Sequence, residues 1–152
     1  MDDQAHLRRA IALAHAARSH GNHPFGAILV VDGAVVCEAE NTVITGGDRT
    51  QHAEMNLLRI AEQTLDLERL RRATLYASTE PCAMCAGAIY WTGVVRVVFG
   101  CPAAELGAMT DGSLVIPCRD VFARGTRRVD TEGPLLLAEA LAPHRGFWGS
   151  RS

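Results

Sequence analysis

Lysine is absent from this sequence, so all 15 side chains counted as lysine or arginine are arginine. The sequence also has 17 aspartate and glutamate residues, which gives a formal net charge of −2. A chain without a basic excess offers no electrostatic reason to expect a nucleic-acid partner or an anionic membrane surface. Apolar runs long enough to span a membrane are missing as well. We therefore expect no membrane partner, and nucleic acid is disfavoured as a partner.

A secretory signal is also missing, because the N-terminus opens acidic and becomes amphipathic without a basic start and an apolar run. The chain has five cysteines, an odd number. Together these features predict a cytoplasmic protein, in which a CxxC pair more often binds a metal or serves catalysis than forms a structural disulfide. The 152 residues contain no repeat, linker or low-complexity segment, which predicts a single domain over residues 1–152.

The apolar periodicity predicts alternating helices and strands. Two β-branched runs flank Asp32-Gly33, a dipeptide typical of a tight hairpin turn. Residues 41–50 are expected to form a loop, and residues 103–124 a loop with one short helix. The predicted helices are 4–19, 52–63, 82–91, 118–123 and 134–142, the last begun by Pro134, and the further strands are 73–79, 94–100 and 127–132. A hairpin within such an alternation implies an α/β fold with a mixed sheet covered by helices.

The stretch EPCAMCAGAIYW contains a cysteine pair, Cys82 and Cys85. Such a pair fits a redox site, half of a structural zinc finger, or two ligands of a catalytic zinc. The remaining cysteines form no second CxxC, so a four-cysteine finger is not available: Cys37, Cys101 and Cys118. A redox pair is conceivable, because the motif follows a predicted strand and opens a predicted helix.

Upstream, the stretch QHAEMN places His52 and Glu54 at the start of a predicted helix. The order H-x-E followed by P-C-x-x-C is the signature of zinc deaminases that act on nucleobases. The pattern predicts a zinc ion held by His52, Cys82 and Cys85, with an open fourth position for water. Glu54 is expected to be the catalytic acid and base that moves protons without binding the metal.

The sequence resembles the cytidine deaminase-like superfamily, in its branch of guanine, cytosine and tRNA-adenosine deaminases. The resemblance is carried by HPFGAILV (23–30), Asn41, HAEMNLL (52–58), TLYASTEPCAMCAGAIYW (74–91) and RVVFG (96–100). It implies a three-layer α/β/α fold with a five-stranded mixed sheet, one zinc per subunit and a homodimer. A homodimer is also favoured by three successive large apolar residues, Ile89, Tyr90 and Trp91, which one buried stripe cannot accommodate.

The resemblance also implies substrate contacts. By motif position, Asn41 is expected to hydrogen-bond the base and Phe25 to stack on it. Ala53 and Glu80 lie where backbone groups contact the ring. Simple core packing is the alternative for Phe25, and a loop-capping role is the alternative for Asn41.

The choice of substrate depends on the C-terminal region. GAIYW is typical of guanine deaminases, whereas RVVFG and DGSL (111–114) are similar to tRNA-adenosine deaminases. The final predicted helix is apolar with one acid, and only two arginines follow it, which is unlike a surface that tracks phosphates. Phe147 and Trp148 are expected to form a lid over a small pocket, with Trp148 contacting the substrate; packing on the fold or on a dimer partner is the alternative.

The sequence therefore predicts zinc-dependent hydrolytic deamination of a free nucleobase or related amino-heterocycle, with a guanine-like purine favoured and cytosine also compatible. The alternatives are a tRNA-specific adenosine deaminase and a nucleoside deaminase. A non-enzymatic zinc-binding module is disfavoured, because it would give Glu54 and an open metal position no role.

Overall fold

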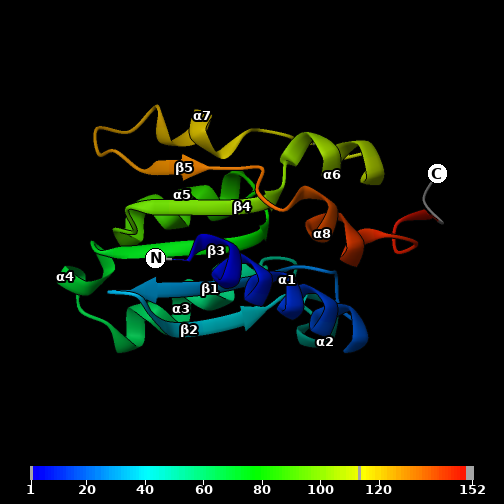
Figure 1. The fold of residues 1–152 in the computed structure, drawn as a ribbon, viewed down its shortest axis with the longest axis horizontal. Coiled ribbons are helices and arrows are strands. Elements are labelled where there is room, and N and C mark those ends of the chain that lie inside the picture. Colours follow the sequence, from blue (N-terminus) through cyan, green and yellow to red (C-terminus); the bar gives the residue numbers. More distant parts are fainter. Residues whose placement is uncertain (1, 113, 150–152) are drawn as a thin grey trace.

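The computed structural model describes residues 2–112 and 114–149. A five-stranded sheet runs through it in the order β2-β1-β3-β4-β5 (Figure 1). Strand β1 is antiparallel to both of its neighbours, β2 and β3, whereas β3, β4 and β5 are parallel to one another. The strands are β1 (Gly26–Val31), β2 (Ala34–Glu40), β3 (Ala73–Thr79), β4 (Arg96–Cys101) and β5 (Asp130–Glu132). The predicted five-stranded mixed sheet is thus confirmed.

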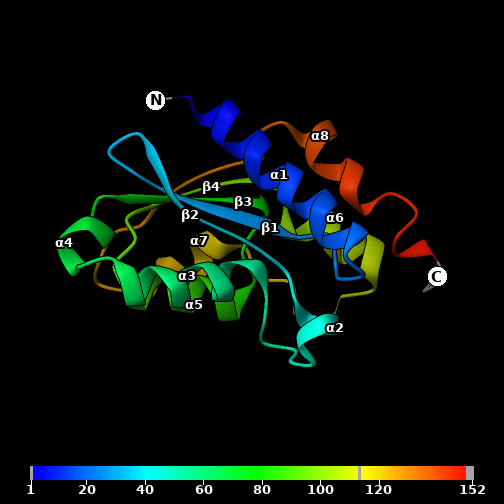
Figure 2. The same ribbon diagram turned by 90° about the horizontal axis from the view of Figure 1, so that it is seen from below.

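Helices cover both faces of the sheet, which confirms the three-layer α/β/α prediction. In Figure 2, α1 and α8 lie above the sheet, and α3 and α5 lie below it. The helices are α1 (Asp3–Ser19), α2 (Val43–Gly46), α3 (Ala53–Thr64), α4 (Leu67–Leu70), α5 (Ala83–Thr92), α6 (Ala103–Thr110), α7 (Cys118–Phe122) and α8 (Leu137–Leu141), followed by the 3-10 turn η1 (Ala142–His144).

Strand β1 separates two apolar clusters because its alternate side chains point to opposite faces. Ala27, Leu29 and Val31 join the cluster formed with α3 and α5, whereas Ile28 and Val30 join the cluster formed with α1 and α8. All five residues of the apolar stripe predicted for the first helix are buried: Leu7, Ala10, Ile11, Ala14 and Ala17. The helical period therefore identified the buried face of α1 correctly.

The hairpin turn and one close helix contact depend on specific residues. Asp32 and Gly33 both have positive φ, at 51° and 80°, as expected for the tight turn that the Asp-Gly pair predicted. At Gly26, an added Cβ would lie 2.4 Å from the carbonyl oxygen of Ala10 and 2.6 Å from the amide nitrogen of Ala14. Only glycine therefore allows the backbone of α1 to approach β1 this closely.

Several predicted elements were wrong, among them the last strand, which was expected over residues 127–132 and begins only at Asp130. Residues 41–50 contain the one-turn helix α2, and residues 103–110 form α6 where a loop was expected. The last helix begins at Leu137 and not at Pro134, because Leu136 has a left-handed backbone with φ 53° that interrupts the helical path. Among the described residues, no helix is long and apolar enough to cross a membrane.

Candidate metal centre and active site

Two helices of the lower layer, α3 and α5, begin at the same end of the sheet (Figure 2). His52 is the residue before α3, Cys82 is the residue before α5, and Cys85 lies in the first turn of α5. Neither His52 nor Cys82 makes a side-chain cap hydrogen bond to its own helix. The predicted ligands are therefore brought together, since their ligand atoms all lie within 4.8 Å of one another.

The spacing of these atoms fits a tetrahedral zinc ion. His52 Nδ1 lies 3.6 Å from the Sγ atoms of both Cys82 and Cys85. A tetrahedral zinc with bonds of about 2.0–2.1 Å to nitrogen and about 2.3 Å to sulfur separates those two ligand atoms by about 3.6 Å. The donor set also fits, because one imidazole and two thiolates leave the fourth position for water.

The pKa values of the Cys82 and Cys85 thiols also indicate a site for a metal cation. A hydrogen bond from Cys85, together with His52, lowers the pKa of the Cys82 thiol to about 4, whereas the neighbouring thiolate and burial raise the pKa of Cys85. Two thiols this close cannot both ionise without a compensating positive charge. A divalent cation provides that charge and allows both to bind as thiolates.

Glu54 lies in the first turn of α3 and is 6% exposed. Burial raises the pKa of this carboxyl to about 7, and the nearby Cys82 thiolate contributes in the same direction. A carboxyl that gains and loses a proton near neutral pH is suited to general acid–base chemistry. The position of Glu54 beside the three ligand residues is thus compatible with the proton-transfer role that the motif predicted.

Glu80 has a side-chain arrangement that the sequence did not reveal. Its side chain is buried, and its two carboxylate oxygens accept backbone N–H groups from Ala103 at 2.9 Å and Cys118 at 2.8 Å. These donors lie at the starts of α6 and α7. The carboxylate therefore ties both ends of the segment 103–118 to the strand end that leads to Cys82.

That segment forms one wall of a small apolar pocket beside the metal ligands. The pocket has a volume of about 70 Å³ and is lined by Glu80 and Cys82 on one side, and by α6 and residues 114–116 on the other. Val115 contributes an apolar side chain that lies close to Gly107 of α6. An apolar wall next to a polar metal centre is typical of sites for flat, partly apolar ligands.

The other predicted contact residues lie around the open end of the hairpin. The N–H of Asn41 donates to the carbonyl of Phe25, so the two residues face each other across that end. Asn41 is buried, and its Oδ1 accepts the N–H of Val43, which is the loop-capping contact weighed as the alternative role. Phe25 packs against the apolar cluster that includes Ala53. Both substrate roles therefore stay predictions.

The C-terminal segment reaches the same end of the sheet. The indole of Trp148 lies 6.3 Å from the ring of Phe25 and 5.5 Å from that of His23, measured between centroids. Trp148 Nε1 donates a 3.0 Å hydrogen bond to Nδ1 of the buried His144. Phe147 packs against His23 and lies under the guanidinium of Arg18. Both aromatic residues thus pack on the fold, and Trp148 lies next to Phe25.

Sequence reasoning missed Asn22, which is 1% exposed. Its Oδ1 accepts the N–H groups of Ile44 and Thr45 and so ties α2 to the segment that precedes β1. The position of Asn22 immediately before the HPFGAILV motif was the available signal. His144 could not be assigned a role from sequence, because its partner Thr79 lies 65 residues away in the chain.

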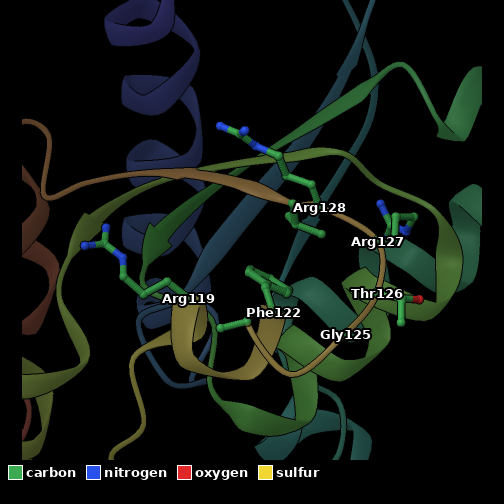
Figure 3. Close-up of a pocket in the computed structure, with 8 residues that line it drawn as sticks. Arg119, Phe122, Gly125, Thr126, Arg127 and Arg128 are labelled. Carbon is green, nitrogen blue, oxygen red and sulfur yellow. The ribbon is translucent and has the colours of Figure 1, made fainter.

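A larger cavity, of about 390 Å³, lies between α7 and the segment leading to β5 (Figure 3). Its arginines extend to different sides and do not converge on one point. Arg127 donates to the carbonyls of Val94 at 2.8 Å and Tyr90 at 2.5 Å, and Arg128 pairs with Asp130. None of the predicted site residues lines this cavity, so we do not place the chemistry there.

Comparisons with known proteins identify a deaminase family with a zinc-binding region. The family described as "Cytidine and deoxycytidylate deaminase zinc-binding region" matches residues 1–101. A probable cytosine deaminase of Schizosaccharomyces pombe is 41% identical over 152 residues, which cover 96% of this chain and 92% of that protein. A guanine deaminase of Bacillus subtilis is 41% identical over 111 residues, which cover 70% of this chain and 71% of that protein. A solved structure from work on A-to-I editing by tRNA:A34 deaminases superposes with a TM-score of 0.78 at 30% identity, covering 92% of this chain and 99% of that one.

Proposed function

This chain belongs to the cytidine and deoxycytidylate deaminase family, and on that basis we propose that it hydrolyses a free nucleobase or a related amino-heterocycle and releases ammonia. The main observation in favour of a small substrate is that the ring of Trp148 lies against the ring of Phe25. An aromatic residue from the chain end, held at the rim of the site, suits closure over a small ring.

In the proposed reaction, one water molecule replaces the amino group of the heterocycle, leaving a carbonyl on the ring and ammonia as the second product. Zinc, when bound by His52, Cys82 and Cys85, supplies Lewis-acid activation of that water. Glu54 accepts a proton from the water and delivers a proton to the departing nitrogen. Its burial keeps the carboxyl away from bulk solvent between the two transfers.

The charge near the C-terminus also favours a small substrate. Helix α8 has five residues and one charged side chain, Glu139, which forms an ion pair with Arg8 of α1. Arg18 is directed to the carbonyl oxygens of Pro143 and Arg145. These arginines are already engaged by groups of the protein, so they are poorly placed to neutralise a phosphate backbone.

A tRNA substrate is the second candidate, because the likeness to a structure from work on tRNA:A34 deaminases extends over nearly all of both chains. Among free bases, the sequence motifs favour guanine. The probable cytosine deaminase of S. pombe is similar over 96% of this chain, so cytosine is an equally important substrate to test. All three substrates therefore belong in one assay.

We also propose a homodimer formed through α5. Ile89 is buried and Tyr90 is half-buried, whereas Trp91 is 84% exposed. Ile60 and Leu67, on α3 and α4, are also exposed apolar side chains. If these side chains form one continuous apolar patch, that patch would suit a contact surface between two copies of the chain. Sedimentation at micromolar concentration tests the assembly, and a strictly monomeric species contradicts it.

The deciding experiment for the substrate measures ammonia release from cytosine, guanine, related amino-heterocycles and nucleosides, beside inosine formation in an adenosine-containing RNA hairpin. The zinc-loaded Glu54→Gln variant is the control for contaminating activities. Turnover of a free base with an inert hairpin supports the proposal. Turnover of the hairpin alone, weakening steeply with salt, assigns the chain to tRNA instead.

A further inference from the structure

His144 is a buried histidine outside the metal centre, and both of its ring nitrogens are engaged. It is 2% exposed and lies at the end of η1. Its Nε2 is 2.9 Å from the hydroxyl of Thr79, the last residue of β3. Its Nδ1 receives the N–H of Trp148 at 3.0 Å. The imidazole therefore joins the C-terminal aromatic residue to the strand that continues, three residues later, into Cys82.

These contacts determine the tautomer of the ring. An indole N–H can only donate, so Nδ1 of His144 must present a lone pair to Trp148. In a neutral imidazole the proton then resides on Nε2 and is donated to the Thr79 hydroxyl. Burial, reinforced by the charge of Arg18, lowers the pKa of His144 to about 4, so the ring is neutral around pH 7.

The backbone of the same segment is anchored independently of the imidazole. Arg18 Nη1 donates to the carbonyl of Pro143 at 3.0 Å and to that of Arg145 at 2.6 Å. Arg18 also lies over the ring of Phe147, 5.4 Å from its centroid. Loss of the imidazole should therefore leave the segment attached to α1 while removing the hydrogen bond that orients the indole.

We propose that His144 is a positioning residue that holds the indole of Trp148 at the rim of the active site, against Phe25. This inference rests on the proposed function only in assigning the indole a role in closing over a small substrate. Thr79 supports the imidazole from the opposite side, since its hydroxyl accepts the Nε2 proton. Among the described residues, the hydrogen bonds and ring contacts of His144 do not reach a metal ligand, and its ring also packs edge-on against Phe25, with 5.5 Å between the ring centroids.

The test uses the fluorescence of Trp148, which does not require enzymatic activity. The chain has two tryptophans, so a Trp91→Phe background leaves Trp148 as the only one. In this background, His144→Phe fills the space but removes the acceptor, and His144→Asn restores an acceptor because its Oδ1 occupies about the position of Nδ1. We expect acrylamide quenching of Trp148 to increase at least about twofold in His144→Phe, in line with loss of one hydrogen bond, and to return toward the parent value in His144→Asn.

The kinetic arm uses the base that the zinc-loaded parent turns over best. We expect His144→Phe and Trp148→Phe to raise KM about three- to tenfold, the equivalent of one hydrogen bond, with a smaller change in kcat. Zinc content and thermal unfolding identify variants that are merely misfolded, and Trp148→Phe carries the test if His144→Phe does not fold. Unchanged quenching in a folded His144→Phe variant, or an unchanged KM in Trp148→Phe, overturns the inference.

The two proposals fail in different ways. If quenching responds to His144 as expected but no free base is turned over, the positioning contact stands and the proposed substrate class is wrong. If a free base is turned over normally while quenching and KM are insensitive to His144, the substrate class stands and the positioning role is wrong.

Discussion

Replacement of Glu80 by glutamine tests how the apolar wall of the site is held. The carboxylate accepts two buried N–H groups, from Ala103 and Cys118. A glutamine side chain has one acceptor oxygen, so its NH₂ group must face one of the two donors. Leaving one buried N–H unpaired costs about 1–3 kcal/mol, and replacing a charged by a neutral acceptor weakens the other bond by about 1 kcal/mol.

The expected loss in the free energy of unfolding is therefore about 2–4 kcal/mol. For a protein of this length that corresponds to a decrease in Tm of roughly 4–16 °C. Because α6 and residues 114–116 line the pocket beside Cys82, KM for the substrate should also rise while zinc content is unchanged. Calorimetry, metal analysis and steady-state kinetics measure the three quantities.

Glu105→Gln is the matched control, because it removes a carboxylate from the exposed surface of the same segment. We expect its Tm and KM to be close to those of the parent. If Glu80→Gln unfolds within about 0.5 kcal/mol of the parent, the carboxylate does not hold the segment, and the argument from its two hydrogen bonds is refuted.

Three further predictions concern the metal centre, the helix contact and the pH dependence of stability. Glu54→Gln should retain zinc by metal analysis and lose about 10²–10⁴-fold or more in kcat. Gly26→Ala forces a Cβ to 2.4 Å from a backbone oxygen of α1 and should cost about 3 kcal/mol or more, whereas Gly87→Ala on α5, with nothing within 4 Å, should be neutral or stabilising in thermal denaturation. The Arg96 guanidinium lowers the pKa of Asp3 to about 2 from 3.8. The stability that distinguishes the parent from Asp3→Asn should therefore be complete above about pH 4 and disappear as the pH falls through about 2, measured by urea unfolding.

The parts of the fold that could be predicted from the sequence are those determined by residues close together in the chain. The stripe of α1 follows the helical period, and the Asp32-Gly33 turn follows from residues that adopt positive φ. The cluster of His52, Cys82 and Cys85, which could hold a metal ion, was predictable because the deaminase signature has those residue types in that order. In each of these cases the deciding residues are close together in the chain or belong to a defined motif.

The parts that sequence missed depend on contacts between distant segments. Helix α2 is a single turn held by Asn22 through two backbone N–H groups about 20 residues away, and such a short helix has no periodicity to detect. The late start of α8 follows from the backbone of Leu136, an apolar residue with no intrinsic preference for positive φ. The contact between His144 and Thr79 spans 65 residues, so no local pattern could indicate it.

His52 and Cys82 each occupy the N-cap position of a helix, but neither side chain accepts a hydrogen bond from an N–H group of that helix. Serine, threonine, aspartate or asparagine at these positions would satisfy free N–H groups of the first turn, but none of them supplies the imidazole nitrogen or thiolate sulfur of this donor set. The chain therefore begins two helices without a side-chain cap, and a metal held by His52, Cys82 and Cys85 would tie these beginnings together. Chelation should accordingly be detected first as faster amide hydrogen exchange over residues 53–56 and 83–86, before the sheet loses protection. We therefore expect a bound metal to stabilise the two helix starts as well as to take part in the chemistry.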